Sequence, residues 1–94
     1  DFTFYVPNAF TPSSTHGTND FFTGYGTNIN TFEMWIFDRW GEQIYHTNDM
    51  THGWDGTAKG GKHPAKQEVY VYKIEVTDFR GDLHKYVGHV TLLR

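Results

Sequence analysis

In the stretch Ile36-Phe37-Asp38-Arg39-Trp40-Gly41-Glu42, a short polar loop separates two runs that are rich in β-branched and aromatic residues. Before the loop, Phe32, Met34 and Ile36 alternate with residues of the opposite face, which is the period of a half-buried strand. Gly41 can take the positive φ that a tight loop requires. The residues from Phe32 to Tyr45 are therefore predicted to form a β-hairpin.

Further strands are expected on both sides of this hairpin. The clearest is Val69–Thr77, in which Tyr70, Tyr72, Ile74 and Val76 share one face at period two. The other predicted strands are residues 2–6, which end at a proline, a short run at 20–23, and residues 83–93, which follow a glycine-containing hairpin loop at 78–82. Turn-forming residues mark the remaining segments, and they predict a surface loop at 8–19, a turn at 24–28 and irregular chain at 47–65.

Short strands, frequent turn signals and the lack of helical periodicity predict an all-β fold. The architecture that fits them is an immunoglobulin-like antiparallel β-sandwich of about seven strands. A chain of 94 residues is long enough for one two-layer domain and too short for two. Because the sequence begins inside a strand-like run, we expect residues 1–94 to be a single domain cut from a longer protein.

Composition excludes several classes of function. The net charge of −3 and the pI of about 6.0 give no basic footprint for nucleic acid. No apolar run reaches about 18 residues, so no segment is predicted to span a membrane. The chain has no cysteine, which excludes disulfides, Cys-ligated zinc and a Cys nucleophile.

Residue types that serve catalysis or metal binding are present without the patterns that these functions need. None of the six His residues has the spacing of a local metal motif. Ser13 and Ser14 are the only serines, and neither lies in a Gly-x-Ser-x-Gly turn. The loop from Ser13 to Asp20 holds one carboxylate, so Asp20 is only a weak candidate ligand for a cation. The sequence thus predicts neither an enzyme nor a cofactor.

Tryptophans are the residues best suited to recognition. Trp54 lies in a second dense motif, where it is expected to pack on the core while Asp55 caps backbone N–H groups of the turn. Alternatively, Trp54 and Trp40 form a surface platform for a sugar ring or a protein partner. Trp35 falls on the face opposite Phe32, where it is a candidate for an exposed apolar contact.

Six motifs, taken together and in this order, resemble a known family. They are Pro7-Asn8-Ala9-Phe10-Thr11-Pro12, Asn19-Asp20-Phe21-Phe22, Ile36-Phe37-Asp38-Arg39-Trp40-Gly41-Glu42, Gly53-Trp54-Asp55-Gly56-Thr57, Val69-Tyr70-Val71-Tyr72-Lys73-Ile74 and Gly88-His89-Val90-Thr91-Leu92-Leu93-Arg94. The chain is similar to the gliding-motility-associated C-terminal domain of Bacteroidetes, which is the type B sorting domain of the type IX secretion system. The likeness spans almost the whole chain.

This resemblance implies a non-catalytic signal at the C-terminus of a large surface protein, often an adhesin. The parent would cross the periplasm and the outer membrane to reach the cell surface or the medium. The implied partners are the type IX secretion machinery and an outer-membrane protein of the PorP/SprF class. The rival interpretations are a carbohydrate-binding or adhesive module and a passive spacer domain.

A secretion signal must be read by a protein, so we expect its information to lie in exposed groups. The candidates for partner recognition are Trp35, Arg39, Trp40 and Arg94, whereas Gly41, Trp54, Asp55 and Gly56 belong to the structural motif. Arg offers bidentate hydrogen bonds and Trp offers a large rigid contact area. The structural alternative for Arg39 is an ion pair with Asp38 or Asp55.

Overall fold

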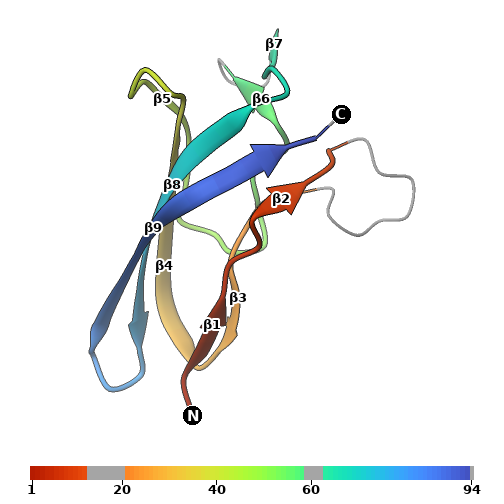
Figure 1. The fold of residues 1–94 in the computed structure, drawn as a ribbon. Helices are drawn as coiled ribbons and strands as arrows, with labels where there is room; N and C mark the ends of the chain where they lie inside the picture. The colour runs from red at the N-terminus through yellow and green to blue at the C-terminus, as the bar shows by residue number, and fades with distance from the viewer. Residues whose placement is uncertain (13–20, 59–62, 94) are drawn as a thin grey trace.

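The structure, a computed structural model, describes residues 1–12, 21–58 and 63–93, which are shown as a coloured ribbon in Figure 1. Within these residues there is no helix, so the all-β prediction is confirmed. The described strands are β1 (Thr3–Tyr5), β2 (Ala9–Phe10), β3 (Tyr25–Thr27), β4 (Ile29–Phe37), β5 (Gln43–Thr47), β6 (Thr57–Ala58), β7 (His63–Pro64), β8 (Val69–Asp78) and β9 (Leu83–Leu92). A search of the same residues finds no helix able to cross a membrane.

The largest sheet has five strands in the order β2-β9-β8-β4-β5. Its neighbouring strands are antiparallel except at one edge, where β2 runs parallel to β9 and Ala9 lies opposite Thr91. Two smaller pairs, β1-β3 and β6-β7, complete the described sheets. The finer prediction of an immunoglobulin-like topology stays a prediction.

Both predicted hairpins are confirmed. β4 pairs with β5 around the loop at Asp38–Glu42, and β8 pairs with β9 around the loop at Asp78–Asp82. Gly41 has φ of +85°, which is the left-handed conformation that the loop requires. Figure 1 shows the two loops at opposite ends of the molecule, because β4 and β8 run in opposite directions.

The core lies on one face of the five-stranded sheet. Alternation along β4 buries Phe32, Met34 and Ile36, as the sequence predicts. The corresponding face of β8 and β9 contributes Tyr70, Ile74, Val76, Val90 and Leu92. Each large apolar side chain that is fully buried here stabilises the fold by about 1.5–3 kcal/mol.

A second layer covers this core. It consists of the β1-β3 pair and of a bridge between Phe22 and Trp54, each of which donates its N–H to the other's carbonyl at 2.8 Å. The ring of Phe4 on β1 packs 6.5 Å from that of Phe32 and 4.8 Å from that of Tyr86, measured between centroids. The N-terminal strand is therefore part of the core packing rather than an appendage.

Three loop predictions were wrong in part. Residues 25–27 of the predicted turn form strand β3, and residues 9–10 of the predicted surface loop form strand β2. The segment 47–65, predicted to be irregular, contains strands β6 and β7. The glycines of the first segment allow close packing: a Cβ at Gly24 would lie 2.2 Å from Cζ of Phe4. In the predicted strand at 20–23, Phe22 makes only an isolated bridge, and Asp20 lies outside the described residues.

Candidate recognition surface at the hairpin tip

The loop Asp38–Glu42 is held rigidly by its first residue. One carboxylate oxygen of Asp38 accepts hydrogen bonds from the N–H groups of Trp40 and Glu42, both at 2.9 Å. Two backbone bonds close the loop, from Asp38 N–H to the Glu42 carbonyl at 2.9 Å and from Gly41 N–H to the Asp38 carbonyl at 3.0 Å. This is ordinary turn chemistry for Asp, and it fixes the backbone from which Arg39 and Trp40 project.

Arg39 and Trp40 point outward from this rigid loop. Trp40 is 79% exposed, and the guanidinium carbon of Arg39 lies 4.9 Å from the centre of its ring. Nε of Arg39 lies 3.6 Å from a carboxylate oxygen of Glu68, and the Arg39 side chain is 65% exposed. The ion pair thus forms with Glu68 and not with Asp38 or Asp55, and it leaves most of the guanidinium accessible to a partner.

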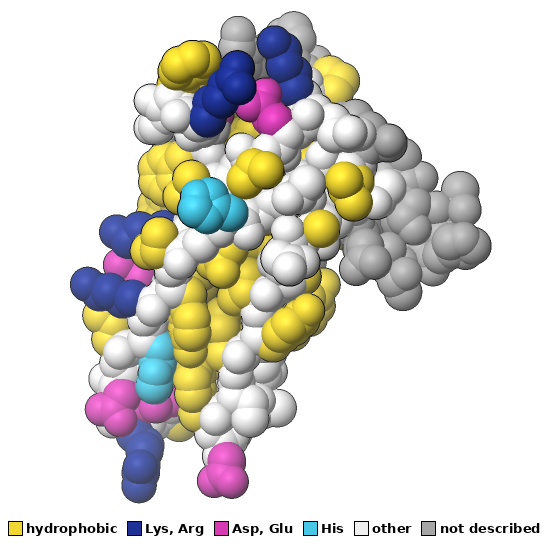
Figure 2. All heavy atoms as spheres, viewed as in Figure 1, with side chains coloured by type: hydrophobic (Ala, Val, Ile, Leu, Met, Phe, Trp, Pro, Cys, Tyr) yellow, Lys and Arg dark blue, Asp and Glu magenta, His cyan; other side chains and the backbone are white. Residues whose placement is uncertain are grey.

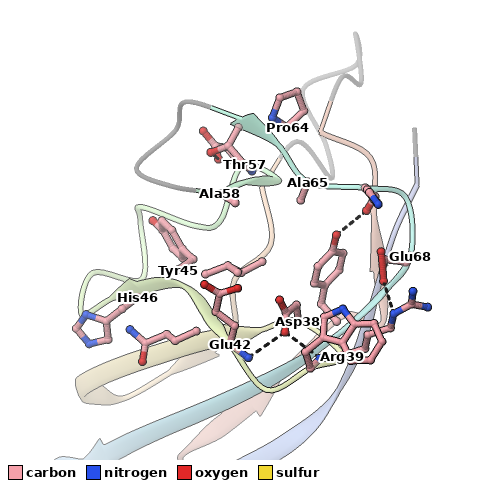
Figure 3. Close-up of a pocket in the computed structure, with 16 residues that line it drawn as sticks. Asp38, Arg39, Glu42, Tyr45, His46, Thr57, Ala58, Pro64, Ala65 and Glu68 are labelled. Atoms are coloured by element: carbon pink, nitrogen blue, oxygen red, sulfur yellow. Dashed lines mark hydrogen bonds and ion pairs between the residues drawn. The ribbon is translucent and has the colours of Figure 1, made fainter.

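A groove of about 910 Å³ lies beside the tip, between the β4-β5 hairpin, the β6-β7 pair and the chain at 64–68 (Figure 3). Four carboxylates line it, and the cations among its lining residues are Arg39 and Lys66. Those carboxylates belong to Asp38, Asp55, Glu42 and Glu68. Figure 3 shows the dashed ion pair of Arg39 and Glu68 at one margin of the groove and Tyr45 on the opposite side.

Trp54 and Asp55 belong to a turn that contributes to the wall of this groove, where Asp55 and Thr57 line it. Trp54 is fully buried, its ring centre lies 5.0 Å from that of Tyr70, and its Nε1 donates to the Thr57 carbonyl at 2.8 Å. Asp55 caps the turn by accepting from the N–H of Thr57 at 3.1 Å and from its hydroxyl at 2.6 Å. The structure therefore agrees with core packing for Trp54 and not with the surface platform.

Gly56 completes this turn with φ of +82°. A Cβ there would lie 2.7 Å from Cγ of Pro12, which joins the turn to the start of the chain.

Burial and nearby carboxylates raise the pKa of one residue of the groove, Tyr45. Tyr45 lines it, and its hydroxyl donates to the His52 carbonyl at 2.8 Å. Burial of the Tyr45 ring raises the pKa of its hydroxyl, and the negative charges of Asp55 and Asp49 raise this pKa further. Tyr45 is therefore a neutral hydrogen-bonding group at physiological pH.

Trp35 lies elsewhere, on the outer face of the five-stranded sheet. Its strand neighbours across the sheet are His46 on β5 and Lys73 on β8. The His46 ring centre is 5.4 Å away, and Nζ of Lys73 is 5.2 Å from the ring centre of Trp35. Trp35 is half-buried between these side chains, so it offers less free area than the sequence suggests.

The second hairpin loop has the same construction, which the sequence reasoning missed. One carboxylate oxygen of Asp78 accepts from the N–H groups of Arg80 at 2.8 Å and Asp82 at 3.1 Å, and Gly81 has φ of +90°. This tip also projects an aromatic residue and an arginine, Phe79, which is 70% exposed, and Arg80. The signal that could have revealed it is the shared pattern Asp-x-x-Gly followed by an acidic residue.

Metal binding has little support in the described part of the chain. No group of three or more His, Asp or Glu side chains able to hold a metal occurs among the described residues. His46 pairs with Glu33 at 2.6 Å, and His52 pairs with Asp49 at 2.7 Å, each as a two-residue contact. Of the remaining candidates, Arg94 and Asp20 lie outside the described residues.

Comparison with known proteins shows which family the chain belongs to. No curated protein matches its sequence. Residues 4–92 match the model of a protein family, the CHU_C type IX secretion signal domain. The match begins within β1 and extends to the end of β9, so it includes the hairpin tip, the groove and the buried Trp54 turn. The chain belongs to the CHU_C family of type IX secretion signal domains.

Proposed function

We propose that this domain is read by its secretion machinery through the tip of the β4-β5 hairpin and the groove beside it. As a member of its family, the domain is a non-catalytic C-terminal sorting signal that directs export across the outer membrane to the cell surface or the medium. Membership of this family does not identify the residues that the secretion machinery recognises. Our proposal assigns that role to Arg39 and Trp40.

The observation that carries the proposal is the exposure of Trp40 and Arg39 on a loop that is otherwise rigid. Arg and Trp are enriched among the residues that dominate the energy of protein interfaces. A loop fixed by Asp38 presents them in one geometry, so binding costs little conformational entropy. The carboxylates of the groove add a polar margin that can orient a partner.

The partner that we propose is an outer-membrane protein of the PorP/SprF class within the type IX machinery. We further propose that residues 1–94 are one domain of a larger surface protein or adhesin, and that its topology is immunoglobulin-like. Support for this topology comes from the five-stranded sheet with β2 parallel to β9 at its edge, faced by the β1-β3 pair.

The test uses a reporter that carries an inner-membrane export signal, fused to this domain in a host with a working type IX system. Arg39→Ala and Trp40→Ala should each reduce surface delivery several-fold, because each removes an exposed contact group. Arg80→Ala and Phe79→Ala are matched controls, since they remove the same kinds of side chain from the equivalent loop at the other end.

The melting temperature of each variant separates recognition from folding, because exposed side chains contribute little to stability. Unchanged delivery of folded Arg39→Ala and Trp40→Ala would refute the tip as the recognition surface. A titration of the isolated domain with oligosaccharides, followed by tryptophan fluorescence, separates secretion from carbohydrate binding: saturable quenching that Trp40→Ala abolishes would favour the carbohydrate-binding module.

A further inference from the structure

Within the described residues, strand β9 has one edge that is largely free. At its end, the N–H of Thr91 donates to the Asn8 carbonyl at 2.9 Å, and the N–H of Leu93 donates to the Phe10 carbonyl at 2.9 Å. The N–H of Leu92 points the other way, to the Glu68 carbonyl at 3.0 Å. Odd-numbered residues of β9 therefore turn their backbone groups away from β8.

The same orientation continues down the strand. β8 and β9 pair without a register shift from Val69 opposite Thr91 to Thr77 opposite Leu83. By the alternation of antiparallel pairing, the backbone groups of Lys85, Val87 and His89 also face away from β8. In the described residues β2 pairs only with Thr91 and Leu92, so these groups have no strand beside them.

Proteins usually protect such an edge, and the two edges of this sheet differ in that respect. The opposite edge, β5, has five residues, and its pairing with β4 shifts register after Ile36. Short strands and bulges of this kind discourage pairing with another chain. β9 has ten residues, no proline and no register shift, and Val87 at its middle is 72% exposed. Among the described residues, β2 covers the end of this edge, and the remainder is protected only by the charge of Lys85.

Ring side chains from β9 and from the N-terminal segment pack together beside the free edge. The ring of Phe4 lies 4.8 Å from that of Tyr86, and the ring of Phe2 stacks on His84 at 4.0 Å with an angle of 11° between the planes. All four side chains are half-buried, so part of each ring remains accessible. Figure 2, which has the same view as Figure 1, shows a band of hydrophobic side chains along the lower half of the molecule.

We propose that the free edge of β9 from Leu83 to His89 accepts an extended segment of the PorP/SprF-type partner as an added strand. This inference rests on the proposed function and names a second contact for the same partner. The added strand continues the line of β2, which already pairs with this edge at Thr91. Strand addition satisfies backbone donors and acceptors that are otherwise left to water.

The side chains along this edge determine which side chains the partner's added strand should carry. Its inward side chains are apolar, because they lie on the rings of Phe4 and Tyr86. Its outward side chain beside Lys85 is acidic, because Lys85 makes no ion pair within the described residues. Alternation of apolar and polar side chains is also what a strand with one buried face requires.

The experiment measures hydrogen exchange at single amides of the purified domain, alone and with a purified PorP/SprF-type protein. In the free domain the amides of Lys85, Val87 and His89 should exchange quickly, whereas those of Tyr86 and Gly88, which face β8, should be protected. Addition of the partner should slow exchange at Lys85, Val87 and His89 at least tenfold.

Two variants test the same contact. Val87→Pro removes an N–H that has no partner in the described structure, and it should weaken binding about tenfold, since it removes one hydrogen bond and obstructs the approach of a strand. Val87→Thr keeps the N–H and a β-branched shape, so it should bind as the wild type does. Lys85→Glu leaves the backbone intact and should weaken binding to an acidic segment, which keeps the test valid if Val87→Pro fails to fold.

The outcomes separate this inference from the proposed function. Binding of the wild type without protection at Lys85, Val87 and His89 would overturn strand addition and leave recognition at the hairpin tip standing. Slow exchange of these amides in the free domain would also overturn it, whether a second copy or a shift of β1 covers them, and light scattering distinguishes the two. Failure of the wild type to bind would overturn the proposed partner itself.

Discussion

At the scale of single residues, two aspartates organise the two ends of the molecule. Asp38 and Asp78 each begin a hairpin loop, and one oxygen of each carboxylate binds two N–H groups of that loop. Asp78 is buried, and its second oxygen lies 2.9 Å from Nε2 of His84. The hydrogen bond with His84 and those with the N–H groups of Asp82 and Arg80 lower the pKa of Asp78 below 3.8.

A prediction about acid stability follows from this lowered pKa. A carboxylate whose folded-state pKa lies below its unfolded value stabilises the protein above that unfolded value, and this contribution is lost as the pH falls through the folded pKa. Thr51 lowers the pKa of Asp49 in the same way, to about 2. The melting temperature of the wild type should therefore fall between about pH 4 and pH 2.

Replacement of these carboxylates should flatten that fall. Asp78→Asn and Asp49→Asn should each melt at a temperature that depends less on pH over this interval, since neither side chain titrates. Thermal melts at half-unit pH steps provide the measurement. A variant with the same pH dependence as the wild type would show that the carboxylate binds protons equally in the folded and unfolded states.

At the scale of elements, the strands with a clear pattern of their own could be predicted, and several of the shortest could not. β4, β8 and β9 each carry an alternating pattern of their own, so local sequence is sufficient to identify them. β2 and β3 have two and three residues, and they are strands only because β9 and β1 lie beside them. Local patterns carry no information about such distant partners.

In the candidate site, too, some features could be predicted from the sequence and others could not. Gly41 and Asp55 act through residues within their own turns, so their structural roles could be predicted. The pairing of Arg39 with Glu68 depends on where the chain after β7 returns to the groove, which no local pattern fixes. The second tip at Phe79 was overlooked because its motif was interpreted only as a turn.

Close packing between β1 and the residue before β3 gives a prediction at this scale. Gly24→Ala should destabilise the domain by about 1–3 kcal/mol, because the new methyl group overlaps the ring of Phe4. Phe4→Leu should recover part of this loss in the double variant. A double-mutant cycle from urea denaturation measures the coupling. Additive free energies of unfolding would show that Gly24 and Phe4 do not constrain each other.

At the scale of the whole molecule, the N-terminal strand completes the second layer. Phe2, Phe4 and Val6 pack against the buried core, next to Phe32 and Tyr86. Domains of this size unfold with a net free energy of about 5–15 kcal/mol, so the loss of several apolar contacts is a large fraction of the total.

Removal of residues 1–7 tests this dependence. The truncated domain should lose at least about 3 kcal/mol of its free energy of unfolding, because β1 no longer covers the aromatic side chains of β4 and β9. Removal of Asp1 alone is the control for shortening the chain. Circular dichroism during urea denaturation provides the measurement, and equal midpoints for the two deletions would contradict the assignment of β1 to the core.

The position of β9 has a consequence for protein synthesis. β9 stands between β2 and β8 in the sheet, yet it leaves the ribosome after the other described strands. A polypeptide that stops before Leu83 leaves both neighbours without their shared partner, and Val90 and Leu92 are missing from the core. Only a chain translated through its final strand can display the folded signal. A product of translation that stops before β9 would therefore lack a folded export signal.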